Sequence, residues 1–462
     1  MCELRRASND FRKSSGRTLV GWRVRTAGRL MQEGLTVLRR AMFLAQMLRN
    51  ESLTPSALAM LQTRQLRSLL RHVRERVPFY SDLYAAHGIC AASGDDPHDL
   101  LQSLPMVDKT MLRAAGATAV SLDAPADRVT INTSGSSGEP FQFQIDRRYD
   151  QWRKAQYLRP YLSAGQRLRD KVLRLTGRPE RPISWFSRLG LLREWRIHSA
   201  ADPTRIIEAW QRLSPHVLQG WPSALRSLAH HCIERGHPLS PAPRMVFTDS
   251  ELLLPDTRAL LERAFGAAAI DIFGTFESDN IAYQCTLRNG YHIATDCVVL
   301  EIVRDGKPVP IGEAGEIVVT VLMNRTTPFI RYNLRDIGRL STQSCPCGLP
   351  FPLLAVVQGR VTDLLVLPDG RRCTPQGIFA GMNNLADTVR HYQLRQTATG
   401  VFEFLIVPAR PLAHVDMQEI IDTMRPTVGN ARIELHLVDA IPPDPSGKRR
   451  LFIPRPQTGE SA

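Results

Sequence analysis

The chain has 462 residues, of which 43% are hydrophobic and 23% charged, an ordinary globular composition that allows two or three domains with cores of their own. No stretch approaches the roughly 18–20 apolar residues that span a bilayer, and the N-terminus lacks the features of a secretory signal, so we expect a cytoplasmic protein. The formal net charge of +14 is uneven, because residues 1–80 hold 16 Lys and Arg against 5 Asp and Glu. This excludes a protein that is basic throughout.

Residues 1–80 are predicted to form a basic helical N-terminal arm. In segment 64–76 arginines fill one face of the predicted helix, and apolar side chains fill the other at Leu66, Leu69, Leu70 and Val73. The segment VPFY at 77–80 ends this helix. Such an arm is either an ordinary solvated helix face or a peripheral docking element for an anionic membrane surface or an acidic carrier. No nucleic-acid motif accompanies the charge, so nucleic acid is not expected as a partner.

An α/β body is predicted from about residue 128, where short apolar strands alternate with longer helical stretches. The strands include VTINT, PFQFQI and AAIDIF, and the helices include DPTRIIEAWQRL and PDTRALLERAFG. Residues 297–340 are β-rich and predict an antiparallel meander on that body. We therefore expect a core domain over residues 81–358 that carries a β-rich subdomain.

A small α+β domain is predicted over residues 364–462, after a hinge at 359–363. The segment DLLVLPDGRRCTP predicts a hairpin around a Pro-Asp-Gly turn, and FEFLIVP and ARIELHLV predict strands with a helix near 416–424 between them. The expected fold class is α/β, with a large N-terminal α/β body, its β-rich subdomain and a small mobile α+β C-terminal domain.

The segment TSGSSGEP, residues 133–140, follows directly on a predicted strand end. Its two glycines and four hydroxyl residues offer N–H and O–H donors without bulky side chains, which are the groups that wrap a phosphate chain. No lysine follows the second glycine, which excludes a P-loop of the GxxxxGK[ST] type. A surface linker rich in serine and glycine is the alternative that this segment by itself leaves open.

Two carboxylate motifs lie downstream. In IDIFGTFE, residues 270–277, Phe273 can lie flat on a purine base and Glu277 can hold Mg²⁺ near phosphates, or the two are a packed phenylalanine and a surface glutamate. Residues 326–340 place Arg331 and Asp336 around Tyr332, a predicted core contact. The two acceptor oxygens of Asp336 suit the hydroxyls of a ribose, and an ordinary surface ion pair is the alternative.

Two basic motifs complete the series. GRVTDLL at 359–365 lies at the predicted domain boundary, where its glycine, Arg360 and its acid suit a hinge and a nucleotide-facing arginine. In SGKRRLFIP at 446–454, Lys448 carries a point charge on a long stem that can reach a phosphate or acyl oxygen. A basic tail on a surface loop is the alternative for this second motif.

Three cysteines and a histidine have the spacing of a zinc site: Cys285, His292, Cys345 and Cys347. A C-x6-H pair is followed, after 52 residues, by C-x-C on a turn with proline and glycine. Three thiolates and one imidazole match a closed tetrahedral Zn²⁺ site, which is structural because it leaves no open position. Reduced cysteines packed as small hydrophobic groups are the alternative, and the eight scattered cysteines argue against a disulfide framework.

The order of these motifs resembles that of the adenylate-forming enzyme superfamily. The resemblance is closest to the branch with phenylacetate–CoA ligase and the adenylating proteins found with capsular polysaccharide genes. TSGSSGEP is followed by FGTFE, TPFIRYNLRDIG, GRVTD and SGKRR. LPMVDKTMLR at 104–113, GWPSAL at 220–225 and IAYQC with GYHI agree as well, so the resemblance covers about residues 60–455.

The resemblance implies that a carboxylic acid is activated with ATP as an acyl-adenylate. The ATP phosphates would lie against Thr133, Ser134, Gly135, Ser136, Ser137 and Gly138. Phe273 and Gly274 would lie beside adenine, and Glu277 would hold Mg²⁺. Asp336 would bind the ribose hydroxyls, Arg360 would contact the ribose or a phosphate, and Asp363 would lie at the hinge. Lys448 would bridge the carboxylate and the α-phosphate, which makes Lys448 and Glu277 the implied catalytic residues.

The resemblance also implies a second half-reaction. A rotation of the small domain would withdraw Lys448 and open a route for a thiol, commonly coenzyme A. Three residues depart from the family pattern, namely Phe276, Arg335 and Thr362. An amine, sugar or carrier-protein acceptor, or a catalytically weakened binding relative, therefore stay open as alternatives. Trp221, Pro222 and residues 247–254 are expected to line the pocket for the acid.

Overall fold

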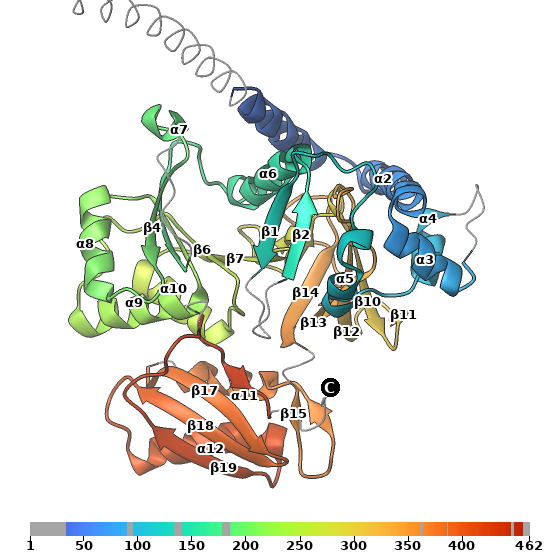
Figure 1. Ribbon diagram of the computed structural model, residues 1–462. Coiled ribbons are helices and arrows are strands. Elements are labelled where there is room, and N and C mark those ends of the chain that lie inside the picture. The colour runs from blue at the N-terminus through green and yellow to red at the C-terminus, as the bar shows by residue number, and fades with distance from the viewer. Residues whose placement is uncertain are drawn as a thin grey trace, which may run out of the picture.

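The computed structural model describes residues 34–89, 96–133, 141–177, 185–360, 364–385, 387–444 and 448–455 (Figure 1). Several predicted site residues lie outside the described part of the chain: Ser134, Gly135, Ser136, Ser137, Gly138, Thr362 and Asp363. For Arg360 only the backbone is described. None of the helices described is long and apolar enough to cross a bilayer.

The described residues of the body form a twelve-stranded sheet, in the order β11-β10-β12-β13-β14-β9-β8-β7-β6-β5-β3-β4. One half is parallel and consists of β3 (Lys171–Thr176), β4 (Arg193–His198), β5 (Val217–Gly220), β6 (Met245–Asp249) and β7 (Ala269–Thr275). The other half is antiparallel and consists of β8 (Asp279–Tyr283), β9 (Tyr291–Ile293), β10 (Val298–Arg304), β11 (Lys307–Pro308), β12 (Ala314–Val321), β13 (Tyr332–Leu340) and β14 (Leu353–Arg360). The predicted strand AAIDIF and the predicted meander are both confirmed.

Helices cover the two faces of the parallel half, since alternate residues of each strand point to opposite faces. Leu218 and Val246 belong to the core with α8 (Pro203–Leu213), α9 (Pro222–Arg235) and α10 (Pro255–Phe265). The next residues along the strands, Phe247 among them, belong to a second core with Tyr161 of α6 (Arg147–Ser163). A short helix, α7 (Trp185–Arg188), precedes β4. The mixed α/β class expected from the sequence is confirmed.

The described part of the basic N-terminal segment is helical and packs on the antiparallel half. Residues 34–50 are helical, and α2 (Pro55–Arg76) begins after the N-cap Thr54 and ends before Val77. Its predicted apolar face is buried in one core with residues of β10, β12 and β13, at Leu66, Leu69, Leu70 and Val73. The connection to the body runs through α3 (Pro78–Ala86), α4 (Pro97–Ser103), α5 (Lys109–Ala115), η1 (Gly116–Ala119) and the hairpin β1 (Val129–Thr133) and β2 (Phe141–Ile145).

The C-terminal region, residues 364–455, has a sheet and a core of its own (Figure 1). Its sheet has the order β19-β18-β17-β20, from β17 (Val389–Ala398), β18 (Val401–Pro408), β19 (Arg432–Leu437) and β20 (Phe452–Ile453). The remaining elements are β15 (Leu365–Val366), β16 (Arg372–Cys373), α11 (Gln376–Gly381), η3 (Met382–Leu385) and α12 (His414–Val428). The predicted hairpin, helix and two strands are present, whereas β17 was not predicted. The division into domains with a mobile hinge stays a prediction.

Candidate active site

Three loops meet at one edge of the parallel sheet. Strands β5, β6 and β7 are neighbours, with Gly220 opposite Thr248 and Thr248 opposite Asp271. The residues that follow these positions therefore lie side by side at the carboxyl edge of the sheet. Trp221 and Ser250 leave the sheet there, whereas Phe273 is the first residue of β7 beyond its pairing with β6 and stays paired with β8. The crevice outside the carboxyl ends of parallel strands is where open α/β sheets bind their ligands.

Lys448 reaches this edge from the C-terminal region. Its Nζ donates a 3.0 Å hydrogen bond to the carbonyl oxygen of Ser250 and lies 5.5 Å from the centre of the Trp221 ring. The backbone holds the lysine in place, because Lys448 N–H donates to Asp444 Oδ1 and Asp444 N–H donates to Lys448 O. The structure thus brings Lys448 to the two loops predicted to line the acid pocket.

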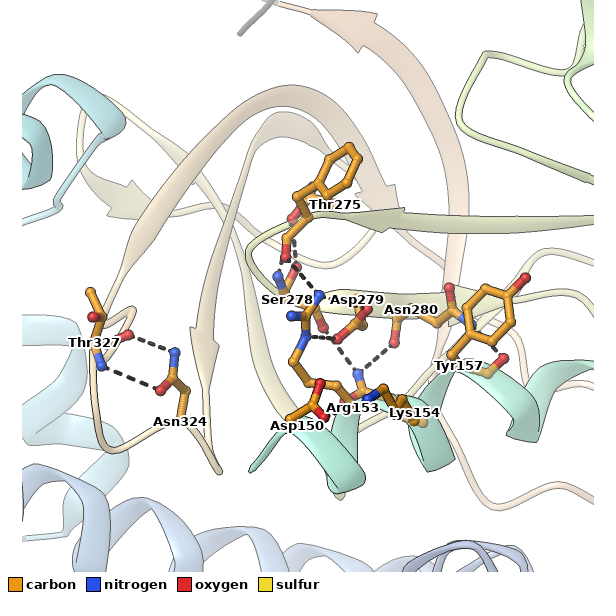
Figure 2. Close-up of polar contacts among 12 residues, drawn as sticks. Asp150, Arg153, Lys154, Tyr157, Thr275, Ser278, Asp279, Asn280, Asn324 and Thr327 are labelled. Atoms are coloured by element: carbon orange, nitrogen blue, oxygen red, sulfur yellow. Dashed lines mark hydrogen bonds and ion pairs between the residues drawn. The ribbon is translucent and has the colours of Figure 1, made fainter. Parts of the chain in front are cut away.

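Glu277 lies in the tight turn between β7 and β8. A Cβ at Gly274 would overlap the carbonyl oxygen of Asp279, so this turn requires glycine at 274. Thr275 Oγ1 and Ser278 Oγ are 2.8 Å apart and close the turn (Figure 2). Glu277 is 9% exposed, and its Oε1 accepts a 3.4 Å hydrogen bond from the Tyr332 hydroxyl.

Helix α6 lies on one side of this turn and holds it by an ion pair and hydrogen bonds (Figure 2). Arg153 forms an ion pair with Asp279 and donates to the carbonyl oxygen of Phe276 at 3.3 Å. Gln156 Nε2 donates to the carbonyls of Ser278 at 3.0 Å and Asn280 at 2.9 Å. Neither Arg153 nor Gln156 was predicted from the sequence. The available signal was the mixture of polar and aromatic residues in YDQWRKAQY, which suits a helix that is buried against polar loops.

An aromatic cluster links the Glu277 turn to the hairpin β1–β2. The Phe329 ring lies 5.1 Å from Tyr332, 5.2 Å from Phe143 and 6.5 Å from Phe141. Phe141 is directly opposite Thr133 in the hairpin, so these two residues flank the segment 134–140. Thr133 Oγ1 is buried, and no described residue hydrogen-bonds to it. The ends of the predicted phosphate loop therefore lie on the same side of the body as Glu277.

Asp336 and Arg360 lie opposite each other on β13 and β14. Arg331, by contrast, is buried away from solvent, where it pairs with Glu301 at 3.1 Å and donates to the carbonyl of Leu104 at 2.6 Å. Arg335 has a φ of +59°, a left-handed conformation in which glycine is the usual residue. Arg335, which stands where the family pattern has glycine, therefore has the left-handed backbone conformation that glycine adopts readily. Its side chain pairs with Asp108 at 2.8 Å.

The predicted zinc ligands come together at the other end of β8. Cys285 follows β8, His292 lies in β9, and Cys345 and Cys347 lie in the turn between β13 and β14. All four ligand atoms lie within 4.8 Å of one another. The Sγ atoms of Cys285 and Cys345 are 3.7 Å apart, close to the roughly 3.8 Å edge of a tetrahedron with Zn–S bonds of about 2.3 Å.

A second edge of this cluster has a similar length, since Cys347 Sγ is 3.3 Å from His292 Nε2. Burial lowers the pKa of His292, which favours the neutral imidazole that binds metals. The donor set and its spacing therefore fit Zn²⁺. Its place at the end of β8 away from the Glu277 turn separates it from the candidate active site.

Comparisons with known proteins find similarity to acid–CoA ligases in both sequence and fold. No family model matches the chain. It is 26% identical over 368 residues to a phenylacetate-coenzyme A ligase of Thermus thermophilus, which covers 74% of this chain and 79% of the relative. It is also 26% identical over 373 residues to a phenylacetate-coenzyme A ligase of Escherichia coli, covering 77% and 83%.

Solved structures of CoA ligases share the fold. 2-Hydroxyisobutyryl-CoA ligase in its postadenylation state, in complex with R3-HIB-AMP, matches with a TM-score of 0.72 at 20% identity, over 88% of this chain and 91% of that one. The same ligase in its thioesterification state matches with a TM-score of 0.58 at 22% identity, again over 88% and 91%. The resemblance drawn from the motif order and the expected fold are both confirmed.

Proposed function

We propose that this chain, which has the fold of the adenylate-forming CoA ligases and is similar in sequence to phenylacetate–CoA ligases, activates a carboxylic acid with ATP and transfers the acyl group to the thiol of coenzyme A. The observation that carries the proposal is the position of Lys448 at the carboxyl edge of the sheet, against Ser250 and Trp221. The relatives are acid–CoA ligases, which supports both half-reactions.

In the first half-reaction a carboxylate oxygen attacks the α-phosphorus of ATP and pyrophosphate leaves. Two anions must be held together, and the Lys448 ammonium supplies a positive charge at the sheet edge that can contact both. Glu277 would hold Mg²⁺, which neutralises phosphate charge when it is bound. Its carboxylate fits this role because it has acceptor capacity beyond the hydrogen bond from Tyr332 and lies in a turn that α6 holds by hydrogen bonds.

The nucleotide would extend from the loop between β1 and β2 to the neighbouring strands β13 and β14. Thr133 would open the phosphate cradle formed with residues 134–138, and its buried hydroxyl, to which no described residue hydrogen-bonds, can donate there. Asp336 would bind the ribose hydroxyls, with Arg360 opposite it on the next strand. Phe273 and Gly274 would lie beside adenine, because both lie in the part of β7 that extends beyond its pairing with β6 at the carboxyl edge.

The test is acyl-adenylate formation, measured as acid-dependent exchange of pyrophosphate into ATP. The acid panel contains phenylacetate, 2-hydroxyisobutyrate, anthranilate and fatty acids. We expect Lys448→Ala to lower the exchange at least about a hundredfold with the best acid. Lys307→Ala, an exposed lysine on β11, is the matched control and should exchange at the wild-type rate. Absence of exchange with every acid, together with absence of ATP binding, would reject the proposal.

The acceptor is tested separately with the acyl-adenylate supplied. We expect thioester formation with coenzyme A in wild type. Acylation of an amine, a sugar or a phosphopantetheine carrier, but not of coenzyme A, would leave the proposed first half-reaction unchanged. This result would reject coenzyme A as the acceptor in the second. ATP binding without exchange for any acid would instead favour a binding relative that keeps the fold.

We also propose that Cys285, His292, Cys345 and Cys347 hold one structural Zn²⁺. The purified protein should contain about one equivalent of zinc, and Cys347→Ser should lose most of it and unfold at a lower temperature. Cys373→Ser is the control, because Cys373 is a free cysteine outside the cluster. Less than about half an equivalent of zinc in protein produced with added zinc would overturn the site.

The cytoplasmic location and the docking of the basic N-terminal arm on a membrane surface or carrier stay predictions. Vesicle co-sedimentation, with anionic and with neutral lipid, tests the docking. Binding to anionic vesicles that 0.5 M salt does not reduce, or no binding at all, would contradict an electrostatic role.

A further inference from the structure

A buried arginine of the body binds the backbone of the C-terminal region. Arg226 lies on α9, and only 6% of its side chain is exposed. Its Nε donates to the carbonyl oxygen of Arg390 and its NH2 to that of Val389, both at 2.8 Å. Its NH1 donates to Asp256 at 2.6 Å and to Thr257 at 2.9 Å, both on α10. The guanidinium therefore joins α9, α10 and β17 in one contact.

The two carbonyl groups are available because β17 is irregular at this point. Val389 pairs with Pro408 and His391 with Val407, so Arg390 is an extra residue in a β-bulge. Pro408 has no N–H to offer across the ladder. A buried carbonyl without a donor costs free energy, and a charged donor such as a guanidinium satisfies it strongly.

Further hydrogen bonds between the body and the C-terminal region connect the position of Arg226 with that of Lys448. Glu251 accepts hydrogen bonds from Ser223 N–H at 2.9 Å, from Ser223 Oγ at 3.0 Å and from Arg449 N–H at 3.2 Å. Ser223 precedes Arg226 on the same helix, and Arg449 follows Lys448. Leu254, from the loop after β6, is buried in the core of the C-terminal region. In Figure 1 the C-terminal region lies below α9 and α10, and it contacts α9 through β17 and α10 through η3.

We infer that Arg226 is a positioning residue for the first half-reaction. It holds the C-terminal region on α9 in the orientation that places Lys448 at the sheet edge. The inference rests on the proposed function, since it assigns Arg226 to one of its two half-reactions. The arrangement of the chain also matches the postadenylation state of 2-hydroxyisobutyryl-CoA ligase better than its thioesterification state. A rotation that withdraws Lys448 must break the two bonds from Arg226 to β17.

The test uses the double variant Arg226→Met with Asp256→Asn, so that no unpaired carboxylate stays buried. Asp256→Asn alone is the first control, because Arg226 then keeps its bonds to β17. Arg263→Met is the second, because it breaks the exposed ion pair between Arg263 and Asp387 across the same interface. Each protein is assayed for pyrophosphate exchange and, separately, for thioester formation from supplied acyl-adenylate and coenzyme A.

We expect the double variant to lose about 10- to 100-fold in exchange while thioester formation stays within about threefold of wild type, since two charge-assisted hydrogen bonds are lost in one orientation only. Both controls should stay within about threefold in both assays. Equal losses in the two half-reactions would assign Arg226 a structural role and overturn the inference. Pyrophosphate exchange at the wild-type rate in the double variant would also overturn it.

Hydrogen–deuterium exchange keeps the inference testable if no acid is turned over by the wild-type protein. In the double variant, the backbone amides of peptides that cover Asp387–Tyr392 and Trp221–Leu225 should then take up deuterium faster than in wild type. In the controls they should not. Failure of the proposed function leaves this result intact, whereas unchanged protection in the double variant overturns the docking role of Arg226.

Discussion

The Tyr332 hydroxyl donates to the carboxylate of Glu277 over 3.4 Å, which joins two motifs 55 positions apart in the chain. Burial and the charge of Glu277 raise the pKa of Tyr332, so its hydroxyl remains protonated and can act as a donor. Tyr332 begins the strand that carries Asp336. Tyr332 therefore connects Glu277, which is proposed to hold Mg²⁺, with the strand of Asp336, which is proposed to bind the ribose.

Replacing Tyr332 with phenylalanine should raise the Mg²⁺ concentration for half-maximal exchange several-fold, because Glu277 loses the donor that orients it. The free energy of unfolding should fall by about 1 kcal/mol. Tyr80→Phe is the control, because its buried hydroxyl donates to Pro328 O at 2.9 Å and its loss should affect stability alone. An equal shift in Mg²⁺ dependence in the two variants would contradict the role of Tyr332.

Gly274→Ala should disrupt the turn that carries Glu277, because its Cβ would overlap the carbonyl oxygen of Asp279. We expect the free energy of unfolding to fall by about 2–4 kcal/mol and exchange to fall more than about tenfold. Urea unfolding measures the first and the exchange assay the second. Gly34→Ala, where no atom lies within 4 Å of the added Cβ, should change neither by much.

Asp271 predicts a pH dependence of stability. Its carboxylate is buried beside the hydroxyls of Thr248 and Tyr291, and burial raises its pKa from 3.8 to about 6. A folded-state pKa above the unfolded value contributes stability at low pH that is lost as the pH rises through 6. Relative to Asp271→Asn, wild type should therefore lose roughly 2–3 kcal/mol of unfolding free energy between pH 4 and pH 7. A constant difference across this range would contradict the prediction.

Arg159 and Asp296 form a buried ion pair between α6 and the start of β10, with 1% and 0% of their side chains exposed and 2.8 Å between them. Arg159→Met should lower the free energy of unfolding by about 3–5 kcal/mol, because it leaves an unpaired buried carboxylate. Adding Asp296→Asn should recover part of that loss. Arg147→Met, which breaks an exposed pair with Asp127, should cost less than about 1 kcal/mol in the same denaturant titration.

The helices and strands that could be predicted are those in which the spacing of apolar residues matches the burial of their side chains. The face of α2 with Leu66, Leu69, Leu70 and Val73 was visible in its helical spacing, and AAIDIF was visible as an apolar run. Strand β17 was not, because VRHYQLRQTA mixes polar and apolar residues. Its polar residues include Gln393 and Gln396, which are buried and hydrogen-bonded to the backbone of neighbouring segments.

From the sequence it was possible to predict which segments would carry the chemistry and in what order, because motif composition and spacing are local properties. The sequence also indicated the four candidate zinc ligands. Which of these residues meet, and which contacts hold them there, follows from the folded chain alone. The contacts of Lys448 with Ser250 and Trp221, the brace of α6 on the Glu277 turn and the bonds from Arg226 to β17 join segments far apart in the chain. Such contacts depend on the packing of whole elements, which no local pattern encodes.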